Sequence, residues 1–216
     1  MRKKKAIIPV HTMADSFGTG IAIGRASVED IHTFDKAAQS HRDDYHIFFL
    51  QEKGTTTGEI DFQQFKIENP CVVYVHPNQV HRLIAVENVT LSFWAIGNED
   101  LNPEYLKLLE DIKPAKPLTL EKEIFSVISE AVSLCIRLSE RKHEKLYHYL
   151  LKDSCNTLVA LVASQYLAQA NPAETLSRFD VMTKAFKAIL ERNFITSKKP
   201  AEYAQALNIS ASYLNE

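Results

Sequence analysis

Four histidines in the first half of the chain, His41, His46, His76 and His81, are the side chains best suited to metal chemistry. Neutral imidazoles commonly bind iron, zinc or manganese, and such a site could serve an oxygenase or an isomerase. A strand-borne site of that kind needs a second histidine two residues away and then a carboxylate, whereas His46 is followed by IFFL. We therefore predict no metal ligands and no cofactor, and a metal-dependent enzyme is kept as the alternative.

Other enzyme motifs are missing from the sequence. The chain contains no glycine-rich phosphate loop, no GxSxG nucleophile motif and no HExxH zinc motif. We predict no catalytic residues.

The same half of the chain offers the parts of a small-molecule pocket, which needs an apolar body and a few directional polar groups. We expect an effector pocket to be lined, as a group, by His46, Phe48, Tyr74, His81, Ser92 and Trp94. Ser92 and the single tryptophan lie two residues apart and so share one face of a strand. For each residue taken alone, core packing is the competing interpretation.

A second candidate site lies at the C-terminal end, in residues 198–216, KKPAEYAQALNISASYLNE. Pro200 suits the first turn of a helix, Asn208 tolerates the left-handed backbone of a tight turn, and Ser210 is a good N-cap for a following helix. Ala204, Asn208 and Leu214 stand at the spacing of a DNA-binding helix-turn-helix. A plain structural hairpin of helices is the competing interpretation.

The distribution of glycine predicts the elements that carry these sites. All six glycines fall in the first 97 residues, and the remainder has none. Short apolar runs between glycines indicate strands, and a glycine-free stretch with a period of 3.6 residues indicates helices. We expect an α+β fold whose strands cover residues 20–26, 45–51, 58–60, 63–67, 71–76, 82–85 and 89–96, arranged as a sandwich or small barrel. Residues 45–50 lack alternation, which predicts a central strand buried on both faces.

The rear half predicts four helical regions. A linker over 101–117 is expected to hold a short helix at 104–112, and amphipathic helices are expected over 118–141, 144–170 and 178–193. The apolar stripe of the helix at 144–170 is wider than one face, so it should pack against more than one neighbour.

Both ends of the chain resemble one protein family. Residues 201–215, AEYAQALNISASYLN, resemble the first helix-turn-helix of AraC/XylS-type transcriptional regulators, whose pattern reads xxYAxxLxISxxYLxx. The runs HRDDYHIFFLQEKG at 41–54, GEIDF at 58–62 and PNQVH at 77–81 resemble the cupin-type effector domain of the same regulators. The resemblance implies a cupin-like jelly-roll barrel with an N-terminal arm over residues 5–13.

The resemblance also implies roles for individual residues. Base-facing positions of the recognition helix correspond to Ala211, Ser212, Asn215 and Glu216, and Ser and Asn side chains suit base edges in the major groove. The helical pair at 118–170 corresponds to the segment that joins two subunits of a homodimer, and packing within the monomer is the competing interpretation. A linker helix and a second helix-turn-helix follow in the family but not in this sequence. We therefore expect a truncated regulator that binds DNA weakly or not at all.

The resulting domain division is an effector domain over 1–100, a linker over 101–117, a dimerisation region over 118–172 and a partial DNA-binding domain over 178–216. The net charge is −2, yet residues 178–216 carry an excess of two positive charges. Cys71, Cys135 and Cys155 are far apart and are expected as reduced thiols, and no apolar run reaches the ~20 residues of a membrane span. These features predict a cytoplasmic protein.

The function expected from the sequence is that of a DNA-binding transcriptional regulator that responds to a small-molecule effector. DNA, the effector and a second copy of the chain are its expected partners, and RNA polymerase is a further candidate. An oligomerisation module that senses nothing is the other competing interpretation.

Overall fold

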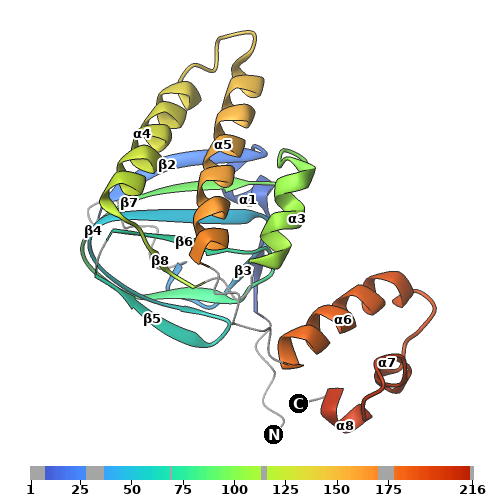
Figure 1. The fold of residues 1–216 in the computed structure, drawn as a ribbon. Helices are drawn as coiled ribbons and strands as arrows, with labels where there is room; N and C mark the ends of the chain where they lie inside the picture. Colours follow the sequence, from blue (N-terminus) through green and yellow to red (C-terminus); the bar gives the residue numbers. More distant parts are fainter. Residues whose placement is uncertain (1–7, 28–36, 69, 113–115, 170–177, 215–216) are drawn as a thin grey trace, which may run out of the picture. The chain divides into compact units, whose positions relative to one another are not determined.

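The computed structural model describes residues 8–27, 37–68, 70–112, 116–169 and 178–214 (Figure 1). The chain divides into two compact units, residues 1–168 and 169–216. The first unit combines a β-sheet with helices, and the described part of the second unit is helical. The division into a β-rich front and a helical rear agrees with the α+β class predicted from the distribution of glycine.

One antiparallel sheet of six strands forms the body of the first unit. Its strands are β2 (Ile21–Ser27), β4 (His46–Ile60), β5 (Gln63–Ile67), β6 (Cys71–Val75), β7 (His81–Ile96) and β8 (Leu118–Thr119). They follow the order β2-β7-β4-β6-β8, and β5 pairs with β4. A separate two-stranded sheet pairs β1 (Val10–His11) in parallel with β3 (Arg42–Asp43).

The closed jelly-roll barrel expected from the resemblance is not found among the described residues. The strand order ends at β2 on one side and at β8 on the other, and no described pairing joins these two edges. Strand β8 has two residues and pairs only with Cys71 and Val72 of β6. It is therefore too short to offer a further strand an edge of useful length.

Strands β4 and β7 are longer than predicted because the gaps left between the expected strands are irregular parts of continuous strands. The expected strands at 45–51 and 58–60 are both parts of β4, and those at 82–85 and 89–96 are both parts of β7. Gly54 has φ 89° and Asn88, opposite it, has φ 51°, and the register of the pair shifts on both sides of Lys53. A Cβ at Gly54 would lie 2.5 Å from the Asn88 carbonyl oxygen, so this position requires glycine.

The sheet buries apolar side chains on both of its faces. One face carries Phe48, Leu50 and Trp94 into a core shared with three helices. The opposite face carries Ile47 and Val73 into a second core with Met13 and Phe65 among its members. Strand β4 contributes to both cores and lies between β6 and β7, which confirms the prediction of a central strand buried on both faces.

Three helices of the first unit cover one face of the sheet (Figure 1). They are α3 (Pro103–Asp111), α4 (Lys122–Ser139) and α5 (Tyr147–Gln169). Leu109 of α3 is fully buried in the shared core, together with Leu101 and Ile112. The segment 101–112 therefore belongs to the core of the first unit, although the sequence predicts it as part of a linker.

The helix expected over 118–141 begins later, at Lys122. Leu118 is buried and pairs with Val72 of β6, so the residues before the helix extend the sheet instead. A short helix, α1 (Met13–Phe17), is capped by Thr12, whose hydroxyl accepts a hydrogen bond from the Asp15 amide. The three cysteines are buried free thiols, as predicted. In the described part of the chain, every helix is too short or too polar to traverse a lipid bilayer.

The second unit contains α6 (Arg178–Asn193), α7 (Pro200–Ala206) and α8 (Ala211–Leu214). The bounds of α6 match the predicted helix at 178–193. Helices α7 and α8 fall on either side of Asn208, where the sequence predicts the turn.

The side chain of Asn156 joins α5 to the segment before α3. Its Oδ1 accepts a hydrogen bond from the Asn102 amide at 2.7 Å, and its Nδ2 donates to the Asp100 carbonyl at 2.9 Å. Asn156→Ala would remove both bonds and leave the buried Asp100 carbonyl without this partner, so we expect the free energy of unfolding to fall by about 1–3 kcal/mol in urea denaturation followed by circular dichroism.

The matched control is Thr157→Ala, one residue further along α5. The Thr157 hydroxyl is exposed and bonds only within its own helix, so its loss should change stability by about 0.5 kcal/mol or less. Equal effects of the two substitutions would contradict the role assigned to Asn156.

Candidate functional site

Helix α7 begins at the position that its sequence favours. Lys199 is the N-cap residue with extended backbone, and Pro200 occupies the first turn, where its missing N–H removes no hydrogen bond. Tyr203 and Ala204 are the buried residues of α7. The Tyr203 hydroxyl donates to the Ser197 carbonyl at 2.7 Å, and its ring meets Phe186 of α6 edge to face at 5.7 Å. These contacts hold α7 against α6 inside the second unit.

The turn between α7 and α8 has the geometry that the sequence predicts. Asn208 is left-handed, with φ 54°, and the Ile209 amide donates back to the Ala204 carbonyl at 3.0 Å. The Ser210 hydroxyl accepts a hydrogen bond from the Tyr213 amide at 3.1 Å, which caps α8. Two short helices, rather than one continuous helix, therefore lie on either side of Asn208.

Two of the four predicted DNA-contacting residues can be placed. Ala211 and Ser212, in the first turn of α8, are exposed. Asn215 and Glu216 lie outside the described residues. Lys198 and Lys199, before α7, are also exposed and put two positive charges on the surface of this unit.

The predicted effector residues occupy the first unit, and three of them form an aromatic stack. Phe48 pairs with Trp94 on β7 and with Tyr74 on β6, so strand register places the three rings side by side. The Phe48 and Trp94 rings are 5.2 Å apart and nearly parallel, and those of Phe48 and Tyr74 are 4.7 Å apart. All three side chains are fully buried beneath the helices, so core packing accounts for each of them.

His46 extends the stack through a chain of hydrogen bonds. Burial raises the pKa of Tyr74 far above its usual value, so its hydroxyl stays protonated and donates to His46 Nδ1 at 2.8 Å. His46 Nε2 then carries a proton, which it donates to Asn98 Oδ1 at 2.9 Å. This arrangement fixes one tautomer of a fully buried imidazole.

One polar atom in the stack has no hydrogen-bond partner, the buried indole Nε1 of Trp94. An unpaired buried N–H lowers the stability of the folded chain by about 1–3 kcal/mol. A ligand that placed a hydrogen-bond acceptor here would recover that free energy. Ser92, two residues before Trp94, is fully buried too, but its hydroxyl donates to Glu52 and accepts from Arg25.

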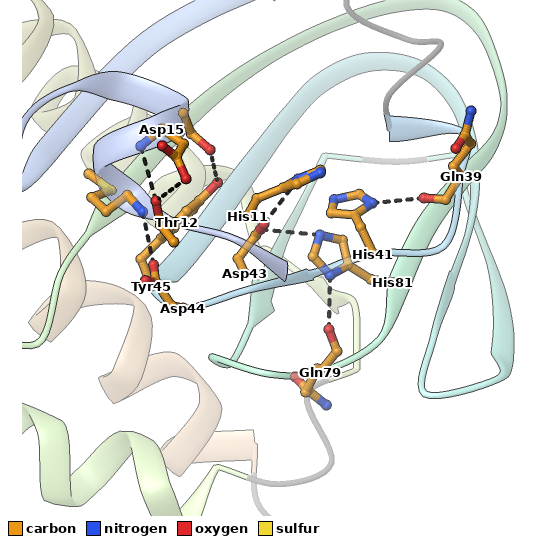
Figure 2. A network of polar contacts seen from close by, with 12 residues as sticks. His11, Thr12, Asp15, Gln39, His41, Asp43, Asp44, Tyr45, Gln79 and His81 are labelled. Atoms are coloured by element: carbon orange, nitrogen blue, oxygen red, sulfur yellow. Dashed lines mark hydrogen bonds and ion pairs between the residues drawn. The ribbon is translucent and has the colours of Figure 1, made fainter. Parts of the chain in front are cut away.

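The sixth predicted residue, His81, lies elsewhere, at the other end of β7. Its ring is part of a cluster with His11, His41 and Asp43 (Figure 2). Neither His11 nor Asp43 is among the residues predicted from the sequence. His41 and Asp43 are two residues apart, a spacing that places both side chains on one face of a strand and could have indicated this pair. No local pattern indicates His11, which lies 30 residues before His41. His76 bonds to the neighbouring Pro77 carbonyl at 2.9 Å.

A surface hollow of about 560 Å³ lies beside the start of α3 and the middle of α5. It is lined by Asn98, Glu99, Leu101, Asn102, Pro103, Tyr105, Lys152, Asp153, Asn156 and Thr157. None of the six predicted effector residues is among them. Asn98, which bonds to His46, connects the hollow to the aromatic stack.

No protein-family model matches this sequence, and no curated protein matches it. Solved structures of AraC-like regulators are similar to it. The AraC-like transcriptional activator CuxR is 12% identical with a TM-score of 0.45, over 89% of this chain and 64% of CuxR. A variant of apo ToxT from Vibrio cholerae is 14% identical with a TM-score of 0.43, over 91% of this chain and 73% of that protein.

ToxT from Vibrio cholerae bound to an unsaturated fatty acid is 13% identical with a TM-score of 0.39, over 91% of this chain and 72% of that protein. These structures are of the kind of regulator that residues 201–215 resemble. The chain spans about two thirds of the length of CuxR.

Proposed function

We propose that this chain is part of a transcriptional regulator of the AraC/XylS type, in which α7, the turn at Asn208 and α8 form a helix-turn-helix that enters the major groove of DNA. The observation that carries the proposal is the pair formed by the left-handed Asn208 and the capping Ser210. They start a new helix whose first turn is exposed at Ala211 and Ser212.

Chemical complementarity supports the same role for α8. Ala211 can contact a thymine methyl group, and the Ser212 hydroxyl can donate to or accept from a base edge. Lys198 and Lys199 are available for phosphates. Two short helices make few phosphate contacts, so binding by this chain alone is weak.

The test is nitrogen–proton NMR of the 216-residue chain with added duplex DNA of mixed sequence at low salt, since shifts report weak binding. We expect the amide signals of residues 210–214 to move most. Ser212→Glu places a carboxylate against the DNA, and we expect it to weaken binding by about 5- to 150-fold, the equivalent of about 1–3 kcal/mol.

Ser164→Glu is the matched control, because Ser164 is an exposed serine on α5 in the first unit. It should leave DNA binding unchanged. The proposal would be wrong if no signal of α7 or α8 moved, or if both serine substitutions had the same effect.

We further propose that the first unit senses a small molecule through the aromatic stack of Phe48, Tyr74 and Trp94. The unpaired Trp94 Nε1 supports this, because a ligand with a hydrogen-bond acceptor would relieve its cost. Side chains fill the space around the stack, so a ligand can enter only if the three rings move apart. The ligand must bind this open conformation more tightly than the closed one in order to raise its population. The adjoining hollow of about 560 Å³ falls in the size range of small-molecule sites.

Trp94 is the single tryptophan and therefore reports on its own site. A panel of small metabolites should contain a compound that changes its fluorescence and, at ~100 times its dissociation constant, stabilises the chain by about 2.7 kcal/mol. Trp94→Phe should keep the fold and reduce that stabilisation. A panel without any response would favour the oligomerisation module that senses nothing.

We also propose that two copies of the chain associate through α4 and the start of α5. Large apolar side chains on these helices and on the turn before α5 remain exposed in the single chain, namely Val127, Leu134, Leu146, Tyr149 and Leu150. An apolar surface of this kind is typical of a protein interface. The helices cover the sheet with their opposite face, where Ile128, Val132 and Leu158 are buried.

Sedimentation equilibrium tests this interface. Leu134→Glu places a charge in it, and we expect the dimer dissociation constant to rise by about 10-fold or more. Leu108→Glu, at an exposed leucine of α3, is the control and should leave it unchanged. A chain that is monomeric at all concentrations would rule the interface out.

The metal-dependent enzyme remains the second candidate, and the cluster of His11, His41 and Asp43 is the observation in its favour. A substrate cavity would have to adjoin that cluster. The hollow of about 560 Å³ has no histidine among its lining residues, which favours the regulator.

A further inference from the structure

Backbone pairing brings four potential metal ligands together at one end of the first unit (Figure 2). His11 on β1 is the register partner of Asp43 on β3. His41 is held opposite His81 by two backbone hydrogen bonds of 3.1 and 2.9 Å. The ring of His41 contacts two other imidazoles: its centre is 4.6 Å from that of His11 and 4.2 Å from that of His81. The cluster is therefore set by strand pairing.

The hydrogen bonds behind the rings prepare two imidazoles for metal binding. His41 Nδ1 lies 2.8 Å from the Gln39 carbonyl oxygen, and His81 Nδ1 lies 3.1 Å from the Gln79 carbonyl oxygen. A carbonyl oxygen only accepts, so each Nδ1 carries the proton that it donates, and the Nε2 of a neutral ring keeps its lone pair. Metal-binding histidines are commonly oriented by this kind of bond.

The carboxylate of Asp43 lacks a full set of partners. Its side chain is almost completely buried, at 4% exposure, and its Oδ1 has no hydrogen-bond donor. The closest basic groups are His11 Nδ1 at 3.7 Å from Oδ1 and His81 Nε2 at 3.4 Å from Oδ2. A buried carboxylate is stabilised by a nearby positive charge, which a protonated imidazole or a bound metal ion can supply.

We propose that His11, His41 and Asp43 bind a divalent transition-metal ion of the zinc type, with His81 beside the carboxylate as a positioning residue. One ligand atom from each of the first three residues lies within 4.8 Å of the other two. Metal–ligand bonds of about 2.0–2.2 Å require a modest closing of this triangle. Imidazole nitrogens favour zinc and its neighbours over magnesium or calcium, which prefer oxygen ligands.

The surroundings suit such an ion. The His11 side chain is one third exposed, which gives an ion a way in from solvent. The bound ion would fasten β1, near the N-terminal end of the described chain, to β3 and to His41, whose backbone pairs with that of His81 at the beginning of β7.

The experiment is a zinc chloride titration of the untagged 216-residue chain, after treatment with a chelator, followed by calorimetry and thermal unfolding. We expect one zinc per chain and a higher melting temperature with zinc. Cobalt in place of zinc should give visible absorption bands. His11→Ala and His41→Ala should each weaken zinc binding by at least about 100-fold, beyond the ~10–100-fold typical of losing a positioning residue.

His143→Ala is the matched control, because His143 is an exposed histidine in the loop between α4 and α5. It should retain the zinc affinity of the unmodified chain. His11 belongs to a two-residue strand, so circular dichroism of His11→Ala should show the fold intact and separate loss of metal from loss of structure.

The proposal is overturned if the chain binds no zinc, or if His11→Ala binds zinc as tightly as the unmodified chain. It is equally overturned if His143→Ala removes binding to the same extent. The site uses no residue of α7 or α8, so either outcome leaves the DNA-binding proposal unaffected.

Discussion

The alignment of Trp94, Phe48 and Tyr74 across β7, β4 and β6 is the constraint on which the first unit depends. Three large rings in register on one face of a sheet can be kept from water only by covering them, and α3, α4 and α5 provide the cover. Cross-strand pairs of this kind also fix strand register, because a shift by one residue would turn the rings to the opposite face. The position of the helices and that of the candidate sensing residues therefore share one cause.

Much of this arrangement could be predicted from sequence because it follows from local patterns. The absence of glycine after residue 97 predicted the helical rear, and α6 begins and ends at the predicted residues. The bulge at Gly54 could not be predicted, because a glycine between apolar runs has the same pattern whether it makes a turn or a bulge. Strands β1, β3 and β8 have two residues each, too few for any periodicity. The open strand order depends on pairing between distant segments.

The candidate sites also divide into those set by local sequence, which could be predicted, and those set by pairing between distant segments, which could not. Asn208 and Ser210 act on their own backbone, so their residue types were sufficient to predict the turn between α7 and α8. His46, Phe48, Tyr74 and Trp94 meet because alternate residues of paired strands share a face. His81, which the sequence prediction groups with them, lies at the far end of β7, past three register shifts. Its neighbours are His41 and Asp43, and His11 joins them by pairing with Asp43 across β1 and β3, which no local pattern contains.

The long ribbon of β4 and β7 also restricts how the gene can vary in length. His46 pairs with Ile96 at one end of the ribbon and Ile60 pairs with His81 at the other, with Gly54 and Asn88 between them. A single-codon insertion or deletion that shifts the register of either strand would turn every side chain beyond it to the opposite face of the sheet. The aromatic rings near one end of the ribbon and His81 at the other end would then no longer keep their present faces. Natural relatives should therefore differ here by substitution, and length changes should concentrate in the connections outside this ribbon.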